Sequence, residues 1–426
     1  MPTPDFLPSL RSLLDALPQR PFALRLPDGT EIPPDSTYTQ PLFTLRFNNV
    51  RALRHLLLPI SELALGEAYL YDDFDIEGDL VAAFAFIDDL DWRKLINGRT
   101  WHHWWRLWRQ LPHRSPTSIL SGEKFTAYNA VGTYHSTERD QRSARFHYDV
   151  SNEFYRLWLD QQMVYSCAYF NSPQEDLDTA QQRKLDLVCR KLNLKRDDTF
   201  LDIGCGWGGL VIHAAQHYGV QATGITLSLA QQAEAEARIQ AAGLANRCRV
   251  IACHYEEFTT QQPFAKIASI GMFEHVGPDR FADYIGQVYN MLQPGGAFIL
   301  QGASTRLDNS HMRQGWLNSV VDWLGYGRNA FYDKYFFPDS ALLDIPTIIS
   351  TAEKIGFEMQ HVENLRHHYA LTLYHWLKNL EAQKETAVLE LGELAYRCWR
   401  LLSAYTYYFM DKGLLTEYQT LFTRHT

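Results

Sequence analysis

The sequence has no apolar run of the length that crosses a membrane and no pair of cysteines spaced as CxxC. A membrane-spanning helix needs about 18 consecutive apolar residues, so we expect no such helix. The six cysteines stand apart along the chain, which is typical of reduced thiols and not of a disulfide framework or a zinc site. The first residues also lack a basic segment followed by an apolar one, so we expect no secretion signal and a cytoplasmic protein.

The chain also has fewer basic than acidic residues. The net charge is −9 at pH 7 with histidine neutral, and this excess of acid argues against general nucleic-acid binding. No spacing of histidine, cysteine and carboxylate ligands indicates a metal site, so we predict no bound metal. Aromatic residues, in contrast, make up 13% of the chain and suit a large apolar substrate or an interface.

The chain is too long for a single hydrophobic core. At 426 residues it exceeds the usual size of one domain, so we expect two. Short strand-like runs alternate with turns between residues 21 and 90, which predicts an N-terminal α+β domain over residues 1–115. We expect a linker over 116–144 and a catalytic domain over 145–426, with an insertion at 305–345 and one long helix at 386–412.

One stretch lacks acids entirely. No aspartate or glutamate occurs between Asp91 and Glu123, although the chain as a whole is acidic. Five of the eleven tryptophans fall here, interleaved with basic residues: Trp92, Trp101, Trp104, Trp105 and Trp108, with Arg93, Lys94, Arg99, Arg106, Arg109 and Arg114. Tryptophan with arginine suits a peripheral helix at the headgroup level of an anionic membrane. A helix that packs its tryptophans between domains is an equally good interpretation.

The segment Thr199–Leu210 has the pattern of a strand, a glycine turn and a helix start. Its apolar run contains Asp202 and is followed by four glycines within six residues, which allow the backbone to approach a ligand closely. No Lys-Ser/Thr pair follows, so the turn is not a phosphate-binding P-loop. It also lacks the third packing glycine of the dinucleotide motif. The pattern predicts the opening of a Rossmann-like, doubly wound α/β sheet.

Four further motifs accompany this turn in a fixed order: Arg145–Tyr155, Met163–Phe170, Gly224–Gln232 and Ser269–Gly277. In order and spacing, the five segments resemble the cyclopropane-fatty-acyl-phospholipid synthase family, including its mycolic-acid-modifying members, within the S-adenosylmethionine-dependent methyltransferases. The resemblance is close from about Arg145 to Leu300 and weaker over the rest of the chain. It implies a class I methyltransferase fold behind a smaller, lipid-binding-like N-terminal domain.

The resemblance also implies that S-adenosylmethionine binds at the glycine turn. The positions that match the family's cofactor contacts are Tyr165, Ser166, Asp202, Gly204, Cys205, Gly206, Thr226, Leu227, Ser228, Gln231, Tyr255 and Glu256. The acid that binds the ribose in dinucleotide folds is missing after the second strand, Gln221–Thr226. His254 stands where the family often has an aspartate.

The family's reaction moves a methylene group from S-adenosylmethionine to the double bond of an unsaturated phospholipid acyl chain, through a carbocation that loses a proton. The resemblance implies that a bound bicarbonate takes this proton, held by a backbone group and by cysteine, glutamate, histidine and tyrosine side chains. Cys167, Glu274 and Tyr369 match three of these, and Gln301 stands in place of the histidine. Glutamine carries no proton at neutral pH. We therefore leave open whether bicarbonate binds and whether the product is ring-closed.

Three functions fit the motifs. The first is the reaction above, or its variant in which a C-methyltransferase leaves a methyl- or methylene-branched acyl chain. The second is N-methylation of a small amine, because some alkaloid N-methyltransferases share two of the motifs. The third is a lipid-binding protein without activity. The aromatic insertion at 305–345 suits a cover for an acyl pocket, and the family implies a homodimer.

Overall fold

The computed structural model describes residues 6–17, 19–50, 52–53, 62–89, 100–111, 127–128, 137–305, 330–337 and 340–425. These residues form two compact units. The first comprises the described residues up to 111 together with 330–331 and Gly392–Tyr408, and the second comprises the remainder. Most of the predicted linker, most of the 305–345 insertion and the tryptophan-rich stretch before Thr100 lie outside the described residues.

The first unit contains a four-stranded mixed sheet in the order β2-β1-β3-β4. Its strands are β1 (Phe22–Arg25), β2 (Glu31–Ile32), β3 (Phe43–Phe47) and β4 (Phe74–Gly78). Alternate side chains of β1 and β3 are buried, because successive side chains of a strand point to opposite faces of the sheet. The helices of this unit include α1 (Leu7–Asp15), α3 (Glu62–Leu70), α4 (Leu80–Asp88) and α6 (Trp101–Gln110).

The C-terminal helical region differs from the predicted one. Gly392, at φ 96°, separates α17 (Lys384–Leu391) from α18 (Glu393–Asp411), so one expected helix is two. Most of α18 also belongs to the first compact unit, whereas the predicted domains place it with the catalytic part. The reason is a buried arginine: Arg397 on α18 pairs with Asp75 at 3.2 Å and donates to the carbonyl of Tyr69 at 2.8 Å. A buried guanidinium needs such partners.

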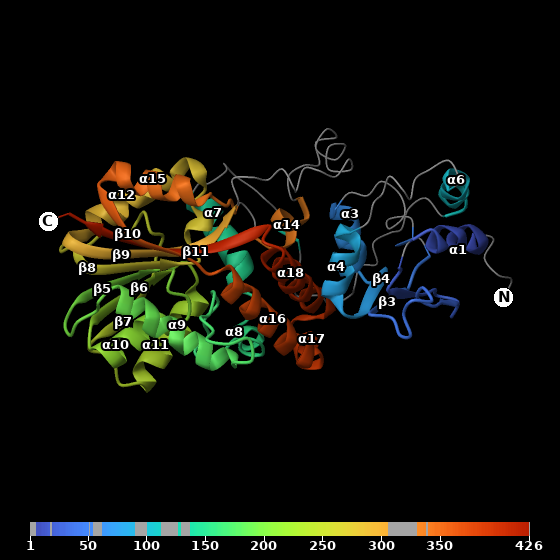
Figure 1. The fold of residues 1–426 in the computed structure, drawn as a ribbon. Coiled ribbons are helices and arrows are strands. Elements are labelled where there is room, and N and C mark those ends of the chain that lie inside the picture. Colours follow the sequence, from blue (N-terminus) through green and yellow to red (C-terminus); the bar gives the residue numbers. More distant parts are fainter. Residues whose placement is uncertain are drawn as a thin grey trace. The chain divides into compact units, whose positions relative to one another are not determined.

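The second unit is built on a seven-stranded sheet in the order β10-β11-β9-β8-β5-β6-β7 (Figure 1). Its strands are β5 (Thr199–Ile203), β6 (Gln221–Thr226), β7 (Cys248–Ala252), β8 (Phe264–Ile270), β9 (Leu292–Thr305), β10 (Phe357–Asn364) and β11 (Leu415–Arg424). Strands β9, β8, β5, β6 and β7 are parallel, and β11 runs antiparallel between β9 and β10. The predicted doubly wound α/β fold is confirmed.

Helices cover both faces of this sheet (Figure 1). One face packs against α9 (Leu177–Lys191), α10 (Gly209–Tyr218) and α11 (Leu229–Ala241), and the other against α12 (Phe281–Met291) and α15 (Ile345–Ile355). Phe200 joins the first cluster and its neighbour Leu201 the second, because successive strand residues point to opposite faces. The remaining helices are α7 (Thr137–Tyr148), α8 (Asn152–Arg156), α14 (Ala330–Tyr335) and α16 (Arg366–Ala382), with 3-10 turns at Phe273–His275 and Pro278–Arg280.

Within the described ranges, no helix combines the length and the apolar character needed to span a membrane.

Candidate active site

The glycine turn between β5 and α10 exposes its backbone to a cavity. Gly204, Gly206 and Gly208 all have positive φ, of 84°, 55° and 80°, which side-chain-bearing residues rarely adopt. A Cβ added to Gly204 would lie 2.9 Å from Met272, whereas one added to Gly206 would meet nothing within 4 Å. Gly208 also caps α10 without a side chain, so the first amides of the helix are available to a ligand. The turn is therefore shaped to hold a group against the backbone.

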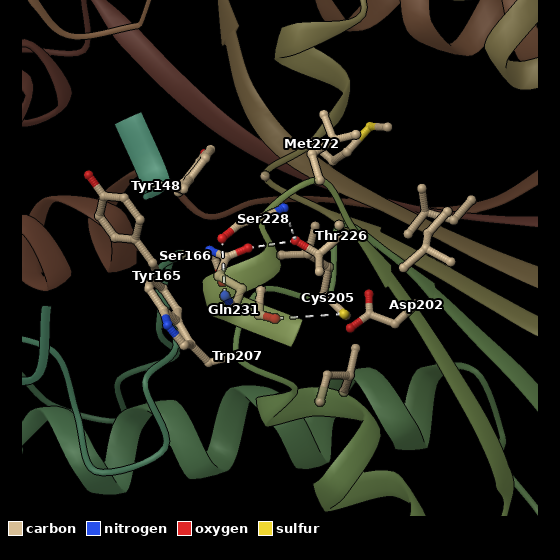
Figure 2. Close-up of a pocket in the computed structure, with 18 of the residues that line it drawn as sticks. Tyr148, Tyr165, Ser166, Asp202, Cys205, Trp207, Thr226, Ser228, Gln231 and Met272 are labelled. Carbon is tan, nitrogen blue, oxygen red and sulfur yellow. Dashed lines mark hydrogen bonds between the residues drawn. The ribbon is translucent and has the colours of Figure 1, made fainter. Parts of the chain in front are cut away.

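Eleven of the twelve residues predicted to bind the cofactor line the cavity at this turn. Figure 2 shows part of its wall, with Tyr148 and Tyr165 to the left of Thr226 and Ser228, and Asp202 to their right. The eleven are Tyr165, Ser166, Asp202, Gly204, Cys205, Gly206, Thr226, Leu227, Ser228, Gln231 and Tyr255. The twelfth, Glu256, does not line the cavity; its Oε1 lies 3.1 Å from Nη1 of Arg280 and its Oε2 lies 3.6 Å from Nδ1 of His254. His254 lines the cavity beside Tyr255.

The polar residues at the end of β6 and after it form hydrogen bonds with one another. Thr226 Oγ1 donates to Gln231 Oε1 at 2.6 Å, and Ser228 Oγ accepts from the Gln231 amide at 3.0 Å and caps α11. Ser228 Oγ also donates to Asp149, a residue that the sequence analysis did not single out. Asp149 follows α7, so an acid does reach the end of the second strand, but from a distant segment. Its place within the Arg145–Tyr155 motif is the signal that could have identified it.

Lys184 is a second residue that the sequence analysis missed. It is almost fully buried on α9, lines the cavity and donates from Nζ to Ser166 Oγ at 2.9 Å. Burial lowers the pKa of Lys184 to about 8 and raises the pKa of Asp202, on the same cavity wall, to about 7. A lysine among the apolar, inward-facing residues of a helix is the sequence signal for such a site.

Tyr148, Tyr165 and His275 form another part of the wall, and His147 contacts Tyr165. The Tyr148 hydroxyl lies 3.2 Å from His275 Nε2, and the Tyr165 hydroxyl lies 3.2 Å from His147 Nε2. The His147 and Tyr165 rings are stacked, with centroids 5.8 Å apart and planes 7° apart. Burial lowers the pKa of His147 to about 3, so this imidazole is neutral. The faces of the Tyr148 and Tyr165 rings suit a positively charged ligand.

Glu274 lies in the 3-10 turn after β8. The apolar run Ile267–Phe273 predicts a strand that continues to Phe273, but the strand ends at Ile270 because Gly271 adopts φ 66°. Glu274 Oε1 accepts from the Ala303 amide at 2.8 Å, and Oε2 is shielded from solvent without a hydrogen-bond partner in the part of the chain that the structure describes. Burial raises the pKa of this carboxyl to about 7. Such a group carries or releases a proton near neutral pH.

Cys167 and the backbone of Tyr369, the other two residues that match the family's proton-handling set, lie near the Leu365 carbonyl. The Cys167 thiol donates to the Ala168 carbonyl at 3.2 Å and lies 3.9 Å from the Leu365 oxygen. The backbone amide of Tyr369 donates to that oxygen at 2.9 Å at the start of α16. Burial raises the pKa of both the thiol and the phenol well above their usual ranges, so both stay protonated.

Gln301 is fully buried on β9, and side chains of β11 occupy both ends of its amide. Its Nε2 donates to Glu417 Oε1 at 3.1 Å, and its Oε1 accepts from Gln419 Nε2 at 2.7 Å. Glu417 is a third residue that the sequence analysis missed. The described residues contain no group of three or more histidine, cysteine or carboxylate side chains that could hold a metal.

A family model described as mycolic acid cyclopropane synthetase matches residues 135–419. A probable fatty acid methyltransferase of Pseudomonas putida is 34% identical over 97% of this chain and 93% of its own length. A sphingolipid C9-methyltransferase of Emericella nidulans is 33% identical over 67% of this chain and 54% of its own. Among solved structures, a mycolic acid cyclopropane synthase complexed with SAH and CTAB is 29% identical with a TM-score of 0.62, covering 67% of this chain and 98% of that one.

Proposed function

Because the chain belongs to the mycolic acid cyclopropane synthetase family, we propose that it transfers a one-carbon unit to the double bond of an unsaturated fatty acyl chain. The chain is an S-adenosylmethionine-dependent methyltransferase of lipids, and S-adenosylmethionine is its cofactor. We propose in addition that the acceptor is the double bond of the acyl chain and that this chain belongs to a phospholipid.

The cavity residues fit this cofactor. The open space at Gly206 lets a ligand contact the backbone, and Ser166 with Lys184 offers donors to a carboxylate. The uncharged faces of Tyr148 and Tyr165 suit a sulfonium cation. When bound, S-adenosylmethionine supplies an electrophilic methyl group.

The protein's own part in the reaction is to stabilise positive charge and to remove a proton. An alkene that gains a methyl group becomes a cation, so an anion in an enclosed site lowers the barrier. Glu274 has the required features: an enclosed carboxyl, one oxygen fixed by the Ala303 amide and the other without a partner among the described residues. This enclosed carboxyl at the carboxyl edge of the sheet is the observation that carries the proposal.

A transfer assay with methyl-labelled S-adenosylmethionine tests it. Vesicles of phospholipid with monounsaturated chains are expected to accept label, and vesicles of the same phospholipid with saturated chains are not. After saponification the label should remain in the fatty acid. Label in the headgroup would instead indicate N-methylation, and no transfer to any vesicle would overturn the proposal.

Two products are compatible with the site. A cyclopropane formed by ring closure is the first candidate, and the likeness to a cyclopropane synthase structure supports it. A methyl- or methylene-branched chain is the second candidate. Gln301 favours it, because β11 occupies both ends of the amide that replaces the family's histidine. The Pseudomonas putida relative, which matches 97% of the chain, is also named a probable fatty acid methyltransferase.

We further propose that α6 binds the surface of an anionic membrane. Trp101, Trp105 and Trp108 lie along one side of this helix with 62%, 46% and 46% of their surfaces exposed, whereas Trp104 and Leu107 are buried. The guanidinium of Arg109 lies 4.8 Å from the Trp105 ring centre. This side combines large amphipathic rings with positive charge, as helices at the membrane surface do.

Reversing two charges on α6 is therefore expected to weaken membrane binding. Each basic residue near an anionic surface contributes roughly 1 kcal/mol, so Arg106→Glu with Arg109→Glu should lower the partition coefficient on phosphatidylglycerol vesicles by about tenfold or more. Co-sedimentation measures this, and added salt should weaken wild-type binding too. Arg11→Glu, on the exposed side of α1, is the control. Equal sedimentation of the double variant and the wild type would favour the domain-packing interpretation.

A further inference from the structure

Glu417 on β11 contacts one of the four residues predicted to handle the proton directly, and backbone groups link it to the other three. It accepts directly from Gln301. It is paired across the strands with Ala303, whose amide holds Glu274. Its own carbonyl accepts from the Leu365 amide at 2.8 Å. The Leu365 carbonyl in turn accepts from the backbone amide of Tyr369 and lies 3.9 Å from the Cys167 thiol. With 3% of its surface exposed, Glu417 is a buried carboxyl at the centre of this group.

A chain of hydrogen bonds determines which oxygen of the Glu417 carboxyl group accepts a hydrogen bond. The Lys191 ammonium can only donate, and it donates to Gln419 Oε1 at 2.6 Å. Gln419 must then present its Nε2 to Gln301, and Gln301 its Nε2 to Glu417. This order makes Glu417 an acceptor through Oε1. Gln301 is its one hydrogen-bond partner among the described side chains, which leaves Oε2 available.

We propose that Glu417 is the base that removes the proton from the methylated acyl chain. The proposal rests on the function proposed above. For ring closure, a C–H bond of the transferred methyl group breaks and its electron pair forms the C–C bond to the cationic carbon. For a branched product, a C–H bond on a carbon next to the cationic carbon breaks and its electron pair forms a C=C bond. The proton goes to Glu417 Oε2, which leaves a neutral carboxyl and a neutral product. The chain thus supplies, from its own sequence, a carboxylate at the place where the family resemblance implies a bound bicarbonate.

The charges around Glu417 suit this role. Burial raises the pKa of its carboxyl well above the usual range, and the Glu274 charge raises it further, whereas the Gln301 hydrogen bond and the Lys184 charge lower it. A raised pKa makes the ionised form a stronger base. A cationic cofactor would favour that ionised form. The titratable and charged groups on the packed elements are Lys184 and Lys191 of α9, Glu363 of β10, Cys167, Glu274 and Tyr369.

Turnover on vesicles of monounsaturated phospholipid tests the proposal in three variants. Glu417→Gln keeps the size of the side chain and an oxygen that accepts from Gln301, but it removes the basic carboxylate. Turnover should therefore fall about a hundredfold or more, while the affinity for S-adenosylhomocysteine (SAH) should be unchanged. Glu417→Asp should retain part of the activity. Glu417→Ala should be inactive and regain turnover when formate or bicarbonate is added. Glu358→Gln, an exposed residue on the neighbouring strand β10, is the control. Wild-type turnover should survive removal of bicarbonate.

Two results would overturn the assignment while the proposed function stands. The first is that Glu417→Gln turns over at the wild-type rate and shows the wild-type pH dependence of turnover. The other is a wild-type enzyme that stops when bicarbonate is removed. If no lipid accepts label at all, the proposed function fails first. Infrared spectra still test Glu417: adding S-adenosylmethionine, but not SAH, which lacks the sulfonium charge, should remove a protonated-carboxyl band that Glu417→Gln lacks. Identical spectra for both proteins would contradict the proposal.

Discussion

Glu274→Gln is expected to lower turnover by about a hundredfold or more while leaving cofactor affinity unchanged. Glutamine keeps the shape of the side chain and can still accept the Ala303 amide, so the 3-10 turn should persist. What is lost is a negative charge in an enclosed site, where it has its largest effect on a developing cation. Steady-state turnover with monounsaturated vesicles and calorimetry with SAH measure the two quantities.

The pH dependence gives a second readout of the same residue. Burial raises the pKa of Glu274 to about 7, so the carboxyl is protonated below that pH and ionised above it. If the ionised form acts, wild-type turnover should rise as the pH increases through about 7, and Glu274→Gln should lack this rise. Glu257→Gln, at an exposed position, is the matched control. Full turnover in Glu274→Gln would exclude a role for the charge.

Gly206→Val should abolish cofactor binding, with SAH affinity reduced at least about a hundredfold. An added side chain at this position meets no protein atom within 4 Å, so it would project into the open space of the cavity. The left-handed φ of 55° adds backbone strain of about 1–2 kcal/mol, which alone should lower stability without removing the site.

Gly243→Val separates these two effects. Gly243 also has a positive φ, of 67°, and its added Cβ also meets nothing within 4 Å, but it follows α11 and does not line the cavity. It should show the strain in thermal unfolding and bind SAH normally. Equal SAH affinity in a folded Gly206→Val would refute the assignment of the glycine turn.

Local patterns predicted the parts of the fold that depend on near neighbours. The strand, turn and helix around Thr199–Leu210 were predicted because an apolar run, positive-φ glycines and a helical pattern follow one another directly. The predicted end of the strand before Glu274 was wrong by three residues, because an apolar sequence continues past Gly271 while its backbone leaves the sheet.

Contacts between segments that are distant in the chain could not be predicted from the sequence. Gln301 and Glu417 are 116 residues apart, and only the antiparallel register of β9 with β11 brings them together. The packing of α18 against Asp75 and Tyr69 depends in the same way on a pairing across the chain. In both cases the deciding feature is a buried charged group whose partner no local pattern specifies.

The most direct test of the central claim uses S-adenosylmethionine with a trideuterated methyl group and a phospholipid whose acyl chain is monounsaturated. Mass spectrometry of the released fatty acid should show one added carbon carrying deuterium, located at the former double bond. Two retained deuteriums would indicate a cyclopropane or a methylene branch, and three a methyl branch on a relocated double bond. Deuterium found only in the headgroup, or equal labelling of a saturated lipid, would contradict the account.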